Sequence, residues 1–147
     1  DILDYRIEHA INFGANYGFN AGKINVDQIK KINNGRLADK VIVSSGSMSA
    51  VEDSFKYIDK KGKILFFAVP SSNIILPSTD LWRNEISLFF SYGAATDDIQ
   101  ATIELYKEKK VNFKDMITHQ FPLSKITEGF KLVEQAKESI KVVVNPD

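Results

Sequence analysis

Two apolar runs constrain the fold of this chain more than any other feature. KVIVSSG at 40–46 and ILFFAVP at 64–70 are apolar at successive positions, and each ends in small residues. A strand that is apolar on both faces is typical of a parallel sheet covered by helices. Between the two runs, Met48, Val51 and Phe55 have helical spacing, which supplies the long connection that neighbouring parallel strands need.

Strands and helices alternate along the whole chain in the same way. We predict strands at 40–46, 64–70, 85–93, 116–121 and 140–144, with brief extended segments at 17–19 and 73–77. We predict helices at 3–13, 26–32 and 48–58, and two more beginning at 96 and 124. This alternation predicts an α/β fold, a doubly wound parallel sheet with helices on both faces. No repeat or linker marks a boundary inside the chain.

Several helix ends have recognisable signals. Asn25, Thr96 and Ser124 precede helical patterns and are predicted to cap them, because their side chains accept hydrogen bonds from free N–H groups. The NNG stretch at 33–35 and the KKG stretch at 60–62 are predicted to end the helices before them.

Composition excludes several function classes. Lysine plus arginine and aspartate plus glutamate number 19 each, so no basic footprint indicates nucleic acid or an anionic membrane as a partner. No apolar run approaches the roughly 20 residues that span a bilayer, and no pattern of a signal peptide is present. The chain has no cysteine, which excludes disulfides and thiolate metal sites within it and favours a cytoplasmic location.

The strand ends are the candidate binding site. Open α/β sheets bind ligands outside the carboxyl ends of their strands, where small residues let a ligand approach the backbone and serine hydroxyls can bond to ribose or phosphate. One such segment alone is more often structural, but three at successive strand ends could contact one ligand. The three segments are Ser44-Ser45-Gly46, Ala68-Val69-Pro70 and Phe90-Ser91-Tyr92.

Asp1 and Arg6 are further candidates at the start of the chain. An acid before a helix can accept hydrogen bonds from adenosine ribose hydroxyls in a dinucleotide-binding fold, which selects NAD over its phosphorylated relative. The alternative is that Asp1 is a helix cap or a terminal residue and that Arg6 is a solvated charge. His9 and His119 are expected to be structural, and two distant histidines make no zinc site.

Four segments carry a family resemblance over essentially all 147 residues. They are GRLADKVIVSSGS, KKGKILFFAVP, LWRNEISLFFSYGA and DMITHQFPLSKITEGFKLVEQAKESIKVVV. In this order they resemble the C-terminal, cofactor-binding half of the zinc-type medium-chain dehydrogenases, closest to the sorbitol and threonine dehydrogenase branch. The resemblance implies a Rossmann-like sheet that is incomplete here, because the family's first strands and glycine-rich loop are absent. Residues 1–147 would then be a partial NAD-binding domain plus a C-terminal helix and strand that return to a catalytic domain.

The resemblance also implies roles for the candidate residues. Asp1 falls on the ribose-binding acid and Arg6 on the basic residue at the adenosine side. Ser44, Ser45 and Gly46 fall along the adenosine side of the cofactor. Two segments, Ala68-Val69-Pro70 and Phe90-Ser91-Tyr92, match the family's segments at the nicotinamide end of the cofactor. Sorbitol dehydrogenases carry an arginine where this chain has Ser91, which puts a sorbitol-like substrate contact in doubt.

For the whole protein, the resemblance implies an NAD-dependent oxidation of a secondary alcohol or polyol to a ketone. The catalytic zinc and most substrate contacts would lie outside these residues, and this segment alone would be inactive. The expected partners are a small-molecule alcohol and further copies of the same chain, as a homodimer or homotetramer paired through 73–77. A non-catalytic nucleotide-binding or subunit-interaction module is the alternative. A zinc-independent quinone reductase relative is a third reading, disfavoured by Asp1 and by the ITHQFPL motif.

Overall fold

The computed structural model describes residues 1–147, which form two compact units. The first unit combines Asp1–Lys23 with Ala94–Asp147, and the second unit is Ile24–Gly93. The second unit contains the three predicted strand-end segments, whereas Asp1 and Arg6 belong to the first.

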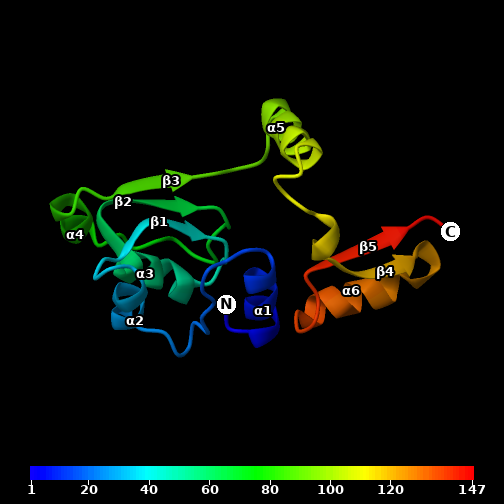
Figure 1. Ribbon diagram of the computed structural model, residues 1–147, viewed down its shortest axis with the longest axis horizontal. Helices are drawn as coiled ribbons and strands as arrows, with labels where there is room; N and C mark the ends of the chain where they lie inside the picture. The colour runs from blue at the N-terminus through cyan, green and yellow to red at the C-terminus, as the bar shows by residue number, and fades with distance from the viewer. The chain divides into compact units, whose positions relative to one another are not determined.

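The second unit is built on a three-stranded parallel sheet (Figure 1). Its strands lie in the order β1-β2-β3, and both pairs are parallel, which confirms the predicted strand direction. Its elements are α2 (Val26–Ile32), β1 (Ala38–Val43), α3 (Met48–Tyr57), β2 (Ile58–Phe66), α4 (Ser78–Arg83) and β3 (Ser87–Phe90). The register aligns Val43 with Phe66 and Phe66 with Phe90, so the three strands end level with one another.

Helix α3 covers one face of this sheet and closes its core. Val51 from the helix and Ile64 from the central strand are 1% and 0% exposed. The buried apolar cluster is Val43, Val51, Ile58, Ile64 and Phe66. Alternation along the strands points the other row, Ile42 and Phe89 with Leu65 between them, to the opposite face. Ile42 is 66% exposed there, so the helices of this unit leave that face largely open.

The boundary between α3 and β2 differs from the prediction. The helical spacing from Met48 predicts a helix to Ile58 that KKG would end, but the helix ends at Tyr57 and Ile58 already begins β2. KKG lies inside the strand, where Lys61 has a φ of 60° and the pairing with β1 shifts register. Ile58 is buried in the strand, and an apolar residue suits the buried face of a helix equally well, so its apolar character could not distinguish helix from strand.

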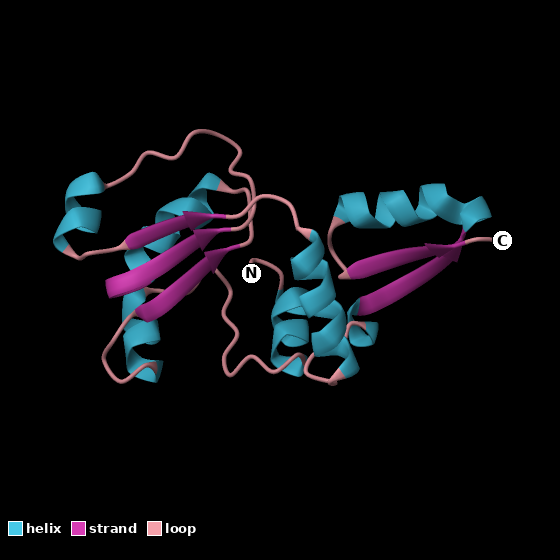
Figure 2. Ribbon diagram, turned by 90° about the horizontal axis from the view of Figure 1, so that it is seen from above, coloured by secondary structure: helices cyan, strands magenta, loops and turns pink.

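The first unit contains a second, smaller parallel sheet. Its elements are α1 (Asp4–Asn12), α5 (Thr96–Lys107), the 3-10 turn η1 (Lys114–Met116), β4 (Ile117–Pro122), the 3-10 turn η2 (Leu123–Lys125), α6 (Ile126–Gln135) and β5 (Lys141–Asn145). Strand β4 pairs in parallel with β5, and α6 lies along this pair (Figure 2). This confirms the predicted strand–helix–strand pattern in the last 30 or so residues of the sequence.

Some local predictions are wrong. Residues 17–19 form no strand, although the rings of Tyr17 and Phe19 stack at 6.3 Å. The extended conformation of residues 73–77 stays a prediction, and these residues pair with no strand. The residue at the N-cap of α5 is Ala95 instead of Thr96, and Ser124 bonds to Asp147 instead of capping α6. The capping role of Asn25 is confirmed.

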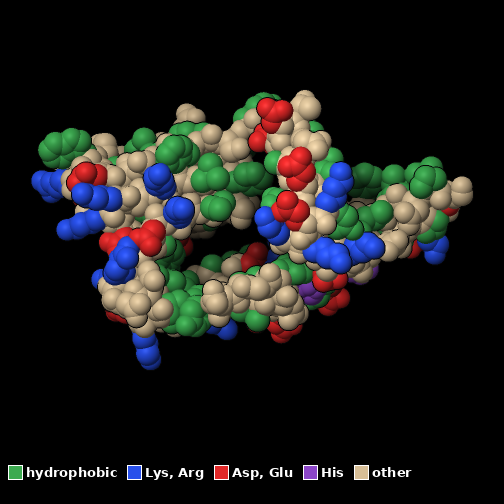
Figure 3. Space-filling model, turned by 45° about the horizontal axis from the view of Figure 1, so that its top comes forward, with side chains coloured by type: hydrophobic (Ala, Val, Ile, Leu, Met, Phe, Trp, Pro, Cys, Tyr) green, Lys and Arg blue, Asp and Glu red, His purple; other side chains and the backbone are tan.

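The surface mixes both signs of charge. On the face shown in Figure 3, acidic and basic side chains are interspersed among apolar ones, so that face has no continuous basic area. None of the helices combines the length and the apolar character that a membrane-crossing segment requires.

Candidate cofactor-binding edge

The carboxyl ends of β1, β2 and β3 form one edge of the second unit. Because the strands are parallel and end level, the residues that follow Val43, Phe66 and Phe90 leave the sheet side by side. The structure therefore brings together the three predicted segments, which we call the strand-end segments. They are Ser44–Gly46, Ala68–Pro70 and Phe90–Tyr92.

Backbone hydrogen bonds hold the first two strand-end segments against each other. The N–H groups of Phe67 and Ala68 both donate to the carbonyl of Val43, at 3.0 and 3.1 Å. The N–H of Ser71 donates to the carbonyl of Gly46 at 2.9 Å. The two segments therefore cannot move independently.

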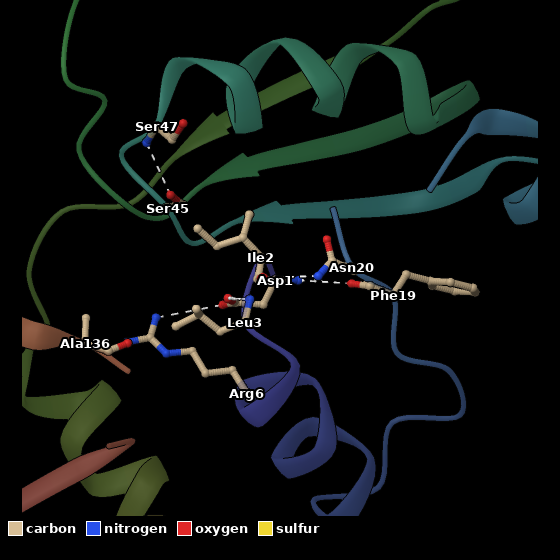
Figure 4. A network of polar contacts seen from close by, with 9 residues as sticks. All are labelled: Asp1, Ile2, Leu3, Arg6, Phe19, Asn20, Ser45, Ser47 and Ala136. Carbon is tan, nitrogen blue, oxygen red and sulfur yellow. Dashed lines mark hydrogen bonds and ion pairs between the residues drawn. The ribbon is translucent and has the colours of Figure 1, made fainter. Parts of the chain in front are cut away.

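Exposed hydroxyl groups lie at the end of β1. Ser44 and Ser45 are both exposed, and the Ser45 hydroxyl accepts the N–H of Ser47 at 3.2 Å (Figure 4). Ser47 is the N-cap of α3, yet its hydroxyl lies 2.8 Å from that of Ser49 and caps no N–H group. The first turn of α3 therefore presents hydroxyls and free N–H groups, both of which suit ribose or phosphate oxygens.

The third strand-end segment is more exposed. Ser91 donates its N–H to the carbonyl of Phe66 at 3.3 Å, and the ring of Phe90 stacks on that of Phe66 at 5.3 Å. Phe90 is nevertheless 69% exposed and Tyr92 is 98% exposed. Aromatic surface of this kind, next to backbone groups at a strand end, suits a flat heterocycle.

An open cavity of about 550 Å³ lies beside the second and third segments. Its lining is mostly apolar and consists of Val69, Pro70, Ser72, Asn73, Ile74, Leu76 and Phe90. The volume falls in the range of small-molecule sites. Sequence reasoning missed the wall formed by residues 72–76, because the NIILP pattern suggested an edge strand. The spacing of Ile74 and Leu76, two residues apart in an extended segment, is the signal that both point to one side.

In the first unit, the structure brings Asp1 and Arg6 together (Figure 4). One Asp1 carboxylate oxygen accepts the N–H of Leu3 at 3.0 Å, and the other lies 3.8 Å from the Arg6 guanidinium. Arg6 also donates to the carbonyl of Ala136 at 3.4 Å. Leu3 is the N-cap of α1, so Asp1 is not the capping residue in the strict sense, and Arg6 is not a free charge.

Asn20 fixes the turn that carries Asp1. Its side-chain amide donates to the carbonyl of Ile2 and to the Asp4 carboxylate, each at 3.1 Å. The N–H of Ala21 donates to the carbonyl of Asp1 at 2.9 Å. The loop after α1 therefore supports the backbone around Asp1, a contact that the sequence pattern did not indicate.

Shifted pKa values mark a different part of the second unit. The N–H of Lys60 and then that of Leu37, with the Arg36 guanidinium, lower the pKa of Asp59. The hydrogen bond that the Lys56 ammonium donates to the Asp53 carboxylate raises the pKa of Lys56. These groups lie around the junction of α3 and β2, away from the carboxyl ends of the strands, and belong to structural ion pairs.

The side chains of this chain do not fit a zinc ion. The structure has no group of three His, Cys, Asp or Glu side chains placed to hold a metal. His9 Nδ1 lies 2.8 Å from the carbonyl of Tyr5, and His119 Nδ1 lies 3.1 Å from the Thr118 hydroxyl. Both histidines thus have structural partners.

The strand order and the helices define an α/β fold of Rossmann type. The model of the family "Zinc-binding dehydrogenase" matches residues 1–108, and the chain belongs to this family. This membership confirms the resemblance to zinc-type medium-chain dehydrogenases and makes the chain part of an oxidoreductase family.

Similar proteins agree with this assignment. The chain is 26% identical to a sorbitol dehydrogenase of Halalkalibacterium halodurans, with 96% of this chain and 41% of the relative covered. It is 22% identical to sorbitol dehydrogenase 1 of Saccharomyces cerevisiae, with 98% and 43% covered. The chain therefore spans about two fifths of the length of these curated relatives.

Solved structures show the same fold. The L-idonate 5-dehydrogenase of Escherichia coli superposes with a TM-score of 0.84 at 17% identity, covering 99% of this chain and 41% of that one. An E. coli alcohol dehydrogenase in complex with NADH gives a TM-score of 0.87 at 19% identity, covering 99% and 43%. At these identities the likeness establishes the Rossmann-like fold.

Proposed function

We propose that this chain binds and orients NAD in a dehydrogenase that oxidises a secondary alcohol or polyol to a ketone. The observation that carries the proposal is the edge where three parallel strands end level. It combines exposed hydroxyls after β1, closely packed backbone after β2 and exposed aromatic surface after β3.

Within the second unit, the strand-end segments bind different parts of the cofactor. The Ser44–Gly46 segment with its hydroxyls takes the adenosine side of the cofactor. The Ala68–Pro70 and Phe90–Tyr92 segments take the nicotinamide end, next to the apolar cavity of about 550 Å³. In the first unit, Asp1 accepts hydrogen bonds from the ribose hydroxyls, and Arg6 lies at the adenosine end of the cofactor, as the family resemblance implies.

The reaction transfers a hydride from the alcohol carbon to the nicotinamide ring, and the hydroxyl proton leaves to give the ketone. The contribution of this chain is to hold the ring in a reactive orientation, which is what a protein supplies to a cofactor of this kind. The zinc that the family implies would be held by residues outside this chain. The names of the relatives, sorbitol and L-idonate dehydrogenases, favour a polyol or a related hydroxy acid as substrate.

The test is a turnover assay with the full-length protein, zinc and NAD. Sorbitol, xylitol, L-idonate and 2-propanol form a suitable panel of secondary alcohols, and NADH formation is followed by absorbance. We expect turnover with at least one of them and a clear preference for NAD over NADP. Binding of NADH without turnover of any alcohol would favour the non-catalytic nucleotide-binding module instead.

We further propose that the protein works as a homodimer or homotetramer in the cytoplasm. Residues 73–77 support the contact, since Ile75 is 89% exposed on an extended segment while Ile74 and Leu76 line the cavity. Analytical ultracentrifugation tests it. A single monomeric species at high protein concentration contradicts the proposal.

A further inference from the structure

Gly46 lies at a position where the structure leaves no space for a side chain. A Cβ atom built on Gly46 would lie 2.7 Å from the carbonyl oxygen of Val69, closer than real Cβ contacts come. Its backbone is not in the left-handed region, so the requirement for glycine comes from the neighbouring carbonyl and not from an unusual φ. The missing side chain therefore lets the two segments approach.

The neighbouring carbonyl cannot move aside cheaply. The loop that carries Val69 is held on one side by the N–H groups of Phe67 and Ala68, which donate to Val43, and on the other by Ser71, which donates to Gly46 itself. A methyl group at position 46 would have to push a backbone atom between these fixed points. The displacement would then reach Ala68–Pro70 as a unit.

The geometry points to Gly46 as a positioning residue for the nicotinamide end of the cofactor, acting through the Val69 carbonyl. The inference rests on the proposed function, since it assumes that Ala68–Pro70 flanks the nicotinamide. The new element is that the position of Ala68–Pro70 depends on Gly46, which belongs to the Ser44–Gly46 segment at the adenosine side. A substitution there would disturb the opposite end of the ligand.

The direction of the missing Cβ makes this distinction testable. The methyl group of alanine would point between the two segments, toward Val69, and not outward to a ligand along Ser44–Gly46. ADP-ribose, which has the adenosine end and lacks the nicotinamide, should therefore bind normally to Gly46→Ala. The affinity for NADH and the rate of hydride transfer should both fall in this variant. A misplacement of about 1 Å can cost about 100-fold in rate.

The experiment measures Kd for NADH and for ADP-ribose by calorimetry, and kcat, in the full-length protein and two variants. Gly62→Ala is the matched control. A Cβ at Gly62 would lie 2.7 Å from the carbonyl oxygen of Asp59 and 2.5 Å from the Ile58 side chain, so the clash is at least as severe, but it lies within β2, away from the strand-end segments. Gly62→Ala should lower stability at least as much as Gly46→Ala without changing the ratio of the two Kd values.

For Gly46→Ala we expect the NADH Kd to rise about tenfold and kcat to fall about tenfold or more, with the ADP-ribose Kd within about twofold. Equal weakening of both ligands, or an unchanged ratio, overturns the inference. Binding of neither ligand by the unaltered protein would instead reject the proposed function. If Gly46→Ala does not fold, Ser71→Pro removes the N–H that holds the loop to Gly46, at an exposed position. The same selective loss of NADH affinity is then expected, and a normal ratio overturns the inference.

Discussion

The Asp1 carboxylate has partners within the fold, and the proposed function also gives it a ligand. Its side chain is 37% exposed, although it accepts one N–H and pairs with Arg6 at 3.8 Å. An exposed ion pair of this kind contributes at most about 1 kcal/mol to stability. Arg6 therefore constrains the orientation of the carboxylate at little energetic cost and leaves lone pairs for ribose hydroxyls.

Replacing Asp1 tests its cofactor role. In the full-length protein, Asp1→Ala should weaken NADH binding about tenfold, because a hydrogen bond to a charged acceptor contributes about 1.5–3 kcal/mol. Discrimination against NADPH should relax, since the negative charge that repels the 2′-phosphate is gone. Glu8→Ala, at an exposed acid of α1 with no ion pair, is the control. Unchanged cofactor preference would remove Asp1 from the site.

Asp59 makes stability depend on acid pH. The N–H groups of Lys60 and Leu37 and the Arg36 guanidinium favour its charged form, which lowers the pKa of Asp59 below its ordinary value of 3.8. A carboxyl with a depressed folded pKa stabilises the protein above its unfolded pKa, and this stabilisation is lost as the pH falls through the folded pKa.

The Asp59→Asn variant should therefore unfold more easily than the unaltered protein at neutral pH. The difference should shrink as the pH falls below 3.8, where the unaltered protein loses the contribution as well. Urea unfolding at several pH values measures it. Glu52→Gln, on the exposed side of α3 and in no ion pair, should show little pH-dependent difference. If the difference in unfolding free energy between Asp59→Asn and the unaltered protein stays the same at pH values well below 3.8, this account of Asp59 is contradicted.

At the scale of elements, a capping box stabilises the N-terminal end of α2. The Asn25 side chain accepts the N–H of Gln28 at 3.0 Å, and the Gln28 side chain accepts the N–H of Asn25 at 2.9 Å. Asn25→Ala should destabilise the protein by about 1 kcal/mol, measured by urea unfolding. Thr96→Ala should change stability by less than about 0.5 kcal/mol, because Ala95 occupies the cap of α5. Equal losses would contradict the assignment of these caps.

The element boundaries explain which parts of the fold were predictable. The apolar strands and the Asn25 cap follow from patterns within a few residues, and the structure confirms them. Tyr17 and Phe19 alternate like a strand, yet no neighbour pairs with them, and alternation alone cannot supply a partner. Ser124 has the chemistry of a cap, but the Asp147 carboxylate, 23 residues further on, takes both its N–H and its hydroxyl.

The candidate site was predictable for a related reason. Parallel strands bring their carboxyl ends to one edge, so the three strand-end segments could be found from the order of the elements. The contact of Gly46 with Val69 and the cavity wall at 72–76 could not, because both depend on which loop folds back against which strand end. The pairing of Asp1 with Arg6 does not follow from helical spacing, because Asp1 lies outside α1 and the two residues are five positions apart. The support from Asn20 does not follow from spacing either.

At the scale of the whole molecule, stability of the second unit depends on a small core. Ile64 is fully buried between α3 and the neighbouring strands, so Ile64→Ala should cost about 2–5 kcal/mol and Ile64→Val about 0.5–1.5 kcal/mol. Ile75→Ala, at a position 89% exposed, should cost less than about 0.5 kcal/mol. Denaturant unfolding followed by circular dichroism measures all three. A small effect at Ile64 would contradict the packing described for this core.

The central claim is that the strand-end segments hold NAD in a member of the zinc-binding dehydrogenase family. The most direct test is a crystal structure of the full-length protein with NADH. We expect the adenosine half of the cofactor along Ser44–Gly46, with Asp1 on the ribose hydroxyls. The nicotinamide ring should lie against Ala68–Pro70 and Phe90–Tyr92. NADH bound away from these segments, or no NADH at saturating concentration, would contradict the claim.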